Sequence, residues 1–219
     1  MLIVGAKGFA REVLEILVAN QSVENLAFYD DISKDITDTL FDKFPILKAK
    51  DEVQKHFNNY GNDFTIGVGI PKLRKQLIDK FIDYGGNLVS TISPRAAIGS
   101  YDVKIANGSN ILDFVTISNS VSIGKANIIY YHSIITHDCK IGDFVEISPN
   151  AVILGRVTIG DFTSVGASAT ILPNIKIGSN VVVGAGSVVT KDVPDNCLVV
   201  GVPAKVIKYI EIDKRLNWF

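Results

Sequence analysis

The chain has 219 residues, of which 47% are hydrophobic and 21% charged, a balance that excludes intrinsic disorder and allows one large domain or two small ones. Its formal net charge of −1 comes from 22 basic and 23 acidic side chains, so we expect no binding to nucleic acid or to an anionic membrane. No segment reaches the roughly 20 uninterrupted apolar residues of a membrane span, and the start lacks a secretion signal, so we expect a cytoplasmic protein.

Short apolar runs alternate with helical patterns over the first part of the chain. The apolar runs fall at residues 2–5, 26–29 and 64–69, and the helical patterns at residues 13–18 and 71–84. This alternation predicts a small parallel α/β sheet. The turn Gly85-Gly86-Asn87 marks its end, so we assign residues 1–87 to a first, Rossmann-like domain.

A glycine turn follows the first apolar run, and a pair of acids follows the second. The turn Gly5-Ala6-Lys7-Gly8-Phe9 stands between a strand and a helix, where backbone N–H groups and a helix N-terminus can bind phosphate. Asp30 and Asp31 end the next strand, where an acid can hold a ribose or a base. The spacing is a degenerate form of the dinucleotide fingerprint, so the turn could also serve only to pack helix on strand.

A six-residue repeat dominates the second part of the chain. Aliphatic residues occupy every sixth position at Ile105, Ile111, Ile117, Ile123, Ile129, Ile135, Ile141, Ile147, Ile153, Ile159, Val165, Ile171, Ile177, Val183 and Val189. An α-helix would spread these positions around its whole surface, whereas a solenoid of short strands would place them on one face. The residue two places earlier is mostly small or apolar, so each strand should carry an inward-facing pair.

This repeat resembles the hexapeptide-repeat acyltransferases, whose coils have three faces and return every eighteen residues. The resemblance implies a left-handed parallel β-helix over residues 88–205, followed by a C-terminal tail, 206–219, that should pack on the β-helix or on a neighbour. It also implies a homotrimer. Glycines directly follow many of the repeat positions, where a bend without a Cβ clash is useful.

Candidate catalytic residues lie at the corners of the predicted coils. His137 should point outward beside Asp138, and a histidine next to a carboxylate is a plausible general base, although corner residues are often merely solvated. Gly155 stacks on His137 one coil later, which leaves space and an accessible N–H for an acyl-transfer site. His132 is the rival base or a helper.

Other candidate residues have structural interpretations. His56 should lie on a solvated helix face. Cys139 occupies an inward position and should be a buried, space-filling thiol. The two cysteines, Cys139 and Cys197, fit neither a zinc spacing nor a disulfide framework, so we predict no disulfide and no metal.

Taken together, the chain resembles the bacterial sugar acyltransferases that include bacillosamine and perosamine N-acetyltransferases and sialic acid O-acetyltransferase-like proteins. The most specific segments are Val4-Gly5-Ala6-Lys7-Gly8, Tyr29-Asp30-Asp31, Pro71-Lys72-Leu73-Arg74, Ile135-Thr136-His137-Asp138-Cys139, Ile147-Ser148-Pro149 and Gly201-Val202-Pro203-Ala204-Lys205.

The resemblance implies a role for each matching position. His137 would be the general base, Asp138 its helper, and Gly155 the donor of an N–H to the thioester. Substrate contacts would come from Gly5, Lys7, Gly8, Phe9, Asp30, Asp31 and Lys72. Acetyl-CoA contacts would come from Glu146, Gly155, Gly184, Ala185, Gly201, Pro203, Ala204 and Lys205. The chain departs from the family at Glu146, where several members have a histidine near the thioester, and at Phe9, where some have a polar residue near the sugar.

We therefore predict an acetyl-CoA-dependent N-acetyltransferase that acts directly on a nucleotide-linked amino sugar of the 4-amino-4,6-dideoxyhexose type. One alternative is an O-acetyltransferase that modifies a sugar hydroxyl with the same residues. Another is a non-catalytic or carbonic-anhydrase-like β-helix, which would require more histidines in the repeat than His132 and His137.

Overall fold

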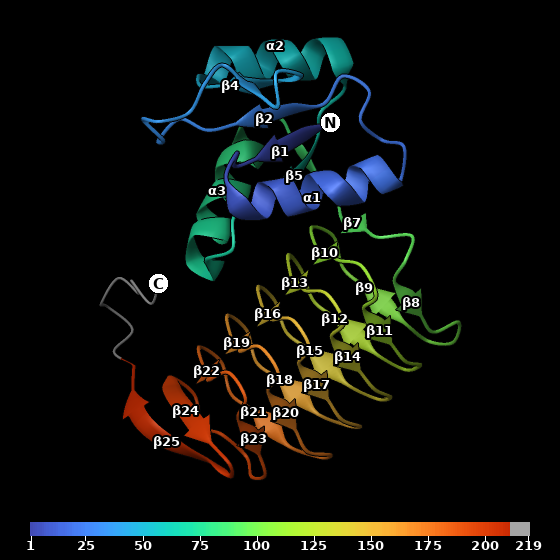
Figure 1. Ribbon diagram of the computed structural model, residues 1–219, viewed down its shortest axis with the longest axis vertical. Helices are drawn as coiled ribbons and strands as arrows, with labels where there is room; N and C mark the ends of the chain where they lie inside the picture. The colour runs from blue at the N-terminus through green and yellow to red at the C-terminus, as the bar shows by residue number, and fades with distance from the viewer. Residues whose placement is uncertain (211–219) are drawn as a thin grey trace.

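The computed structural model describes residues 1–210, which form an α/β domain seated on one end of a three-sided β-helix (Figure 1). The α/β domain contains β1 (Leu2–Val4), α1 (Gly8–Ala19), β2 (Ala27–Tyr29), β3 (Thr39–Leu40), β4 (Phe44–Leu47), α2 (Lys50–Tyr60), β5 (Asp63–Ile66), α3 (Pro71–Asp83) and β6 (Asn87–Leu88). No helix in residues 1–210 is long and apolar enough to cross a membrane.

The α/β domain is built on the parallel sheet that the alternating pattern predicts. Its strand order is β3-β4-β2-β1-β5-β6, and every neighbouring pair is parallel except β3 and β4. Ile3 and Phe28 are fully buried in a cluster with residues of α1, whereas Leu2 and Ala27 are buried in a cluster with residues of α2 and α3. Helices therefore cover both faces, which explains why the strands are apolar without alternation.

His56 is buried, which contradicts the solvated position expected from the sequence. It lies on α2, only 7% exposed, with Nε2 3.3 Å from the Met1 carbonyl oxygen. The polar residues around His56 in sequence hid the fact that this position of α2 faces the sheet. Burial lowers the pKa of its imidazole.

The β-helix has three faces built of parallel two-residue strands, and face 1 ends in the longer strands β24 and β25. Face 1 contains β7 (Thr91–Ile92), β10 (Asn110–Ile111), β13 (Ile128–Ile129), β16 (Glu146–Ile147), β19 (Ser164–Val165), β22 (Val182–Val183), β24 (Cys197–Gly201) and β25 (Ala204–Tyr209). Face 2 contains β8 (Ala97–Ile98), β11 (Thr116–Ile117), β14 (Ile134–Ile135), β17 (Val152–Ile153), β20 (Thr170–Ile171) and β23 (Val188–Val189). Face 3 contains β9 (Lys104–Ile105), β12 (Ser122–Ile123), β15 (Lys140–Ile141), β18 (Thr158–Ile159) and β21 (Lys176–Ile177).

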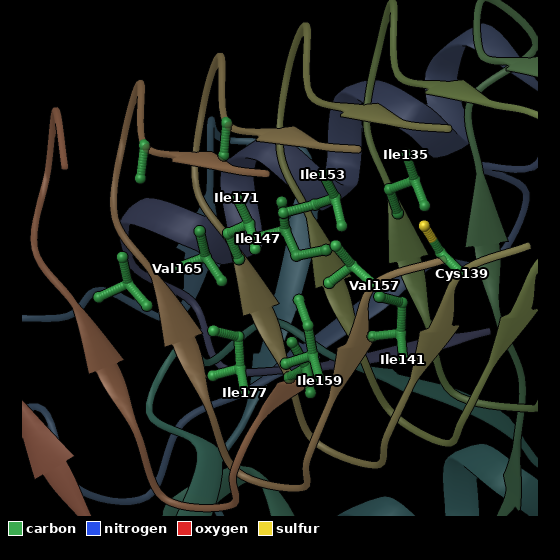
Figure 2. Packing of buried hydrophobic residues seen from close by; sticks show 14 of the residues in the cluster. Ile135, Cys139, Ile141, Ile147, Ile153, Val157, Ile159, Val165, Ile171 and Ile177 are labelled. Atoms are coloured by element: carbon green, nitrogen blue, oxygen red, sulfur yellow. The ribbon is translucent and has the colours of Figure 1, made fainter. Parts of the chain in front are cut away.

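The repeat residues stack inside these faces as predicted. Figure 2 shows Ile135, Ile153 and Ile171 in line on one face, with side chains of the other faces packed against them. Ile92 pairs with Ile111 and Ile105 with Ile123, so the first coil carries one extra residue between Ile98 and Ile105. The corner glycines allow close stacking: a Cβ on Gly142 would lie 2.3 Å from Asp161 Oδ1 in the next coil.

Two strands cross the domain boundaries that the sequence suggests. β6 extends the first sheet to Leu88, and β25 pairs antiparallel with β24 as far as Tyr209. The antiparallel pair closes the end of face 1 and takes in part of the segment 206–219, whose last nine residues lie outside the described part of the chain.

The α/β domain is held on the β-helix by buried polar contacts. The Arg74 guanidinium on α3 donates from Nε to the Ala126 carbonyl at 2.8 Å and from Nη2 to the Phe144 carbonyl at 3.0 Å, and from Nη1 to Gly69. Asn110 on β10 donates to the Ile66 carbonyl at 2.8 Å. These bonds fix the ends of β5 and α3 against the first coils.

Candidate active site

The corners between faces form three edges, which carry different candidate residues. Edge 1–2 lies between faces 1 and 2, edge 2–3 between faces 2 and 3, and edge 3–1 between faces 3 and 1. His137 follows β14 and therefore lies on edge 2–3, as does Gly155, which follows β17. These two residues are brought together as predicted.

His137 and Asp138 form an outward-facing pair. The carboxylate oxygen Oδ2 of Asp138 lies 2.7 Å from Nδ1 of His137, and both side chains are 52% exposed. A proton on Nδ1 would be donated to this carboxylate, which leaves Nε2 with a free lone pair. The pair therefore has the geometry of an oriented general base.

Gly155 lies directly against the imidazole of His137. A Cβ at this position would be 2.6 Å from Cε1 and 2.7 Å from Nε2, so only glycine permits the observed ring position. Gly155 is itself buried, because the ring fills the space that the sequence led us to expect beside it. Among the backbone hydrogen bonds of residues 1–210, none is donated by the Gly155 N–H.

Thr136, the residue before His137, has a hydroxyl oxygen that is buried without a hydrogen-bond partner. It is the one side-chain polar atom with this property in the described part of the chain. Buried hydroxyls are normally hydrogen-bonded to protein or to water.

The two alternative reactive residues are placed away from such chemistry. His132 lies on edge 1–2, where its ring stacks on that of Phe114 at 5.1 Å between centroids. Cys139 is fully buried in the β-helix core, and burial raises the pKa of its thiol. Cys139 is therefore the space-filling residue that we predicted; both it and Cys197 are free thiols.

The glycine turn of the α/β domain joins β1 to α1, as the sequence predicts. Gly5 has a φ of +112°, and a Cβ there would lie 2.8 Å from the Gly67 carbonyl oxygen. Gly8 opens α1, with nothing within 4 Å of a Cβ placed on it. Lys7 precedes α1 and forms an exposed ion pair with Asp35 at 2.8 Å.

Phe9 connects this turn to the β-helix. Its ring lies 5.4 Å from the ring of Tyr130 on edge 1–2. The turn therefore ends against the β-helix, and Phe9 occupies the junction between the two domains.

The paired acids follow β2 as expected, but each is engaged within the chain. Asp30 accepts hydrogen bonds from the backbone N–H of Ile32 at 3.1 Å and from that of Ser33 at 2.9 Å. Asp31 accepts hydrogen bonds from Lys80 Nζ at 2.8 Å and from the Tyr29 hydroxyl at 2.9 Å, which lower the pKa of its carboxyl against the opposing effect of burial. Asp30 thus orders the turn, and Asp31 has a fixed orientation.

The remaining predicted cofactor residues gather at the far end of edge 1–2. A Cβ on Gly184 would lie 2.7 Å from the Val200 side chain, and the Gly201 N–H donates to Ser187 Oγ at 3.1 Å. The corner that holds Gly184 and Ala185 therefore contacts the hairpin between β24 and β25, which carries Pro203, Ala204 and the exposed Lys205. Lys72 is the second residue of α3 and is exposed.

Glu146 lies at the junction between the domains, on face 1, whereas His137 lies on edge 2–3 of the same chain. Oε2 of Glu146 would lie 4.0 Å from a Cβ placed on Gly69. Burial raises the pKa of the Glu146 carboxyl, and the nearby charge of Arg74 opposes that shift. Burial also lowers the pKa of Arg74 to about 10.

Arg74 belongs to one of the specific sequence segments, but no role was predicted for it, and Tyr130 was not predicted as a site residue. The signal for Arg74 was present, because it shares one side of α3 with the buried residues Ile78 and Phe81 at helical spacing. No comparable pattern distinguished Tyr130.

Within residues 1–210, no group of three or more His, Cys, Asp or Glu side chains is arranged to hold a metal ion.

Comparison with known proteins supports the family resemblance over both domains. The family described as the PglD N-terminal domain matches residues 1–81, and the bacterial transferase hexapeptide (six repeats) matches residues 138–172 and 156–191. GDP-perosamine N-acetyltransferase of Escherichia coli O157:H7 is 30% identical over 165 residues, which are 68% of this chain and 67% of that protein.

Solved structures are similar over almost the whole chain. PerB from Caulobacter crescentus, in complex with CoA and GDP-perosamine, is 29% identical with a TM-score of 0.86, covering 94% of this chain and 96% of that one. The acetyltransferase domain of PglB from Neisseria gonorrhoeae FA1090, in complex with acetyl coenzyme A, is 28% identical with a TM-score of 0.83, covering 94% and 98%. The chain therefore belongs to the hexapeptide-repeat sugar N-acetyltransferases with a PglD-type N-terminal domain, and it is an acetyl-CoA-dependent acyltransferase with the left-handed β-helix of that family.

Proposed function

We propose that this protein transfers an acetyl group from acetyl-CoA to the amine of a nucleotide-linked 4-amino-4,6-dideoxyhexose, with His137 as the general base. The observation that carries the proposal is the pair of contacts made by His137: Nδ1 lies 2.7 Å from Asp138, and the other side of the ring rests on Gly155. The similarity to PerB, solved with CoA and GDP-perosamine, supports the choice of substrate class.

The roles of the chain's own groups follow from this geometry. Asp138 holds the proton on Nδ1, so Nε2 accepts the proton that the amine loses as it attacks the acetyl carbon. The Gly155 N–H donates to the oxygen on which negative charge develops. As the C–N bond forms, the C–S bond of the thioester breaks, and CoA leaves as the free thiol with the proton returned from Nε2 of His137. The residues of the far end of edge 1–2, with the exposed cation of Lys205, are suited to hold the polar parts of acetyl-CoA.

The proposed site needs more than one copy of the chain. His137 and Gly155 lie on edge 2–3, whereas Gly184 and Gly201 lie on edge 1–2 and Phe9 rests on the same edge. Face 2 separates these edges. A ring of copies that meet through face 2 would place edge 2–3 of one copy against edge 1–2 of the next.

The outward residues of face 2 support such a contact. They are Ala97, Thr116, Ile134, Val152, Thr170 and Val188, none of which is charged, and Ile134 is 38% exposed. Face 3 instead presents Lys104, Lys140 and Lys176. An uncharged, partly apolar face is suited to association, and a three-sided prism suits threefold closure. We therefore propose a homotrimer that works in the cytoplasm, where acetyl-CoA and nucleotide sugars are made.

The test uses acetyl-CoA with GDP-, UDP- and dTDP-linked 4-amino-4,6-dideoxyhexoses and follows release of the free thiol. Wild-type protein should acetylate at least one sugar to an alkali-stable amide, and His137→Ala should lower kcat by about 10²- to 10⁴-fold. Ser120→Ala, on the same edge one coil earlier, is the matched control. An alkali-labile ester product would favour O-acetylation, and undiminished turnover by His137→Ala would refute the base.

Sedimentation measures the assembly independently. Wild type should sediment at about three times the mass of the 23.8 kDa chain. Ile134→Glu should yield monomers and abolish transfer, because a charge on face 2 would be buried at the contact. Monomeric, fully active wild-type protein would exclude a site shared between copies.

A further inference from the structure

Glu146 is an acidic residue at the junction between the two domains, and no residue in the described range 1–210 forms a hydrogen bond or an ion pair with its carboxylate. Only burial and the charge of Arg74 act on the pKa of this carboxyl. Arg74 is near enough to influence it electrostatically, yet the four hydrogen bonds shown for Arg74 go to carbonyl oxygens of both domains. A carboxylate in a partly desolvated position normally has a partner.

The surroundings of Glu146 indicate where that partner would come from. Gly69 follows β5, which pairs with β1, so it lies at the same edge of the sheet as the Gly5 turn. A Cβ placed on Gly69 would be 4.0 Å from Oε2 of Glu146. Tyr130 lies within electrostatic reach of Glu146: burial raises the pKa of the Tyr130 phenol, and the negative charge of Glu146 raises it further. The Tyr130 ring contacts Phe9, the residue at which the glycine turn reaches the β-helix.

Glu146 therefore faces the place where a sugar carried by a nucleotide in the α/β domain would reach the β-helix. Ligands bind outside the carboxyl ends of parallel strands, which here are the ends of β1, β2 and β5. The sugar must leave that crevice toward the β-helix in order to meet the acetyl donor, and the junction formed by Phe9, Tyr130 and Glu146 lies on this path.

We infer that Glu146 binds the protonated amine of the amino sugar and thereby selects amino sugars over their hydroxyl counterparts. This inference rests on the proposed function. An ammonium group brings three donors and a positive charge to a carboxylate that has neither an ion-pair partner nor a hydrogen bond within the described part of the chain. A hydroxyl brings one donor and no charge, so it would leave the carboxylate only partly compensated.

The role of Glu146 is in binding: the bound ammonium releases one proton to water to become the neutral amine, and His137 takes the second proton as that amine attacks the thioester. This assignment differs from the thioester contact that the family resemblance suggests for the same position. The two roles are separable, because one affects the affinity for the sugar and the other the affinity for acetyl-CoA.

The experiment compares wild type with Glu146→Gln, which keeps the shape of the side chain and removes its charge. Isothermal titration calorimetry measures the affinity for three ligands. These are the nucleotide amino sugar that wild type acetylates, the same nucleotide sugar with a hydroxyl in place of the amine, and the nucleoside diphosphate alone. We expect wild type to prefer the amine, and Glu146→Gln to weaken binding of the amine by about 10- to 100-fold, with the other two ligands nearly unaffected. Glu15→Gln, an exposed acid on α1, is the control for a change in net charge.

Steady-state kinetics provide the second readout. Glu146→Gln should raise KM for the amino sugar and leave KM for acetyl-CoA unchanged. The inference is overturned if the variant keeps the preference for the amine, or if KM for acetyl-CoA rises instead. A wild-type protein that acetylates none of the amino sugars would refute the proposed function itself, a result distinct from either of these.

Discussion

Replacing Gly155 with alanine tests the proposed base while leaving residue His137 itself unchanged. The new Cβ would lie 2.6 Å from Cε1 and 2.7 Å from Nε2 of His137, and ordinary contact begins near 3.4 Å. The imidazole must therefore move by about 0.8 Å. Since a misplacement of about 1 Å can cost about 10²-fold in rate, we expect Gly155→Ala to lower kcat by about two orders of magnitude.

The fold should tolerate this change, because the His137 side chain is 52% exposed and can turn toward solvent. The assay is thiol release at saturating acetyl-CoA, together with thermal denaturation to show that the protein is folded. The double variant with His137→Ala gives the sharpest comparison. If the methyl group acts through the imidazole, it should cost nothing more once the imidazole is gone.

Two results would refute this reasoning. The first is a folded Gly155→Ala protein whose kcat stays within about twofold of wild type, where a displaced base should cost far more. The second is a loss that is equally large with and without the imidazole at position 137, since the methyl group would then act on something other than the base.

Three further predictions concern the buried polar groups. Arg74→Met should lower the free energy of unfolding by about 3 kcal/mol, measured by urea denaturation, because carbonyls of both domains lose their donor; Lys75→Met, on the exposed side of α3, should change it little, and equal effects would contradict the assignment. Burial lowers the pKa of His56 in the folded protein below its ordinary value of 6.5, so the unfolded chain binds more protons as the pH falls below that value, and stability is lost there. The urea midpoint of wild type should therefore drop between pH 7.5 and pH 5, and that of His56→Gln should drop less steeply. An unchanged slope would exclude His56 as the titrating group. Cys139→Ser should keep kcat, since the thiol of Cys139 is buried in the core, and a loss of turnover without unfolding would instead indicate an acyl-enzyme formed on this thiol.

The alternating patterns and the six-residue repeat determined the fold from sequence alone. Both patterns are periodic because the backbone geometry is periodic. In each coil an inward position recurs every six residues, independently of what packs against the coil from outside. The family resemblance added the three-sided coil with its eighteen-residue return, and this return together with the repeat placed Gly155 on His137. The buried position of Cys139 followed for the same reason.

Only the tertiary structure decided how the two domains meet. The burial of His56 and the four carbonyls around Arg74 depend on which side of each helix faces a neighbour, and short helices with mixed polarity leave that side undetermined in the sequence. The place of Glu146 depends on a contact between residues that are far apart in the chain, the coil at β16 and the segment after β5. Such contacts leave no periodic trace, so the structure alone reveals the unpaired carboxylate at the junction between the domains.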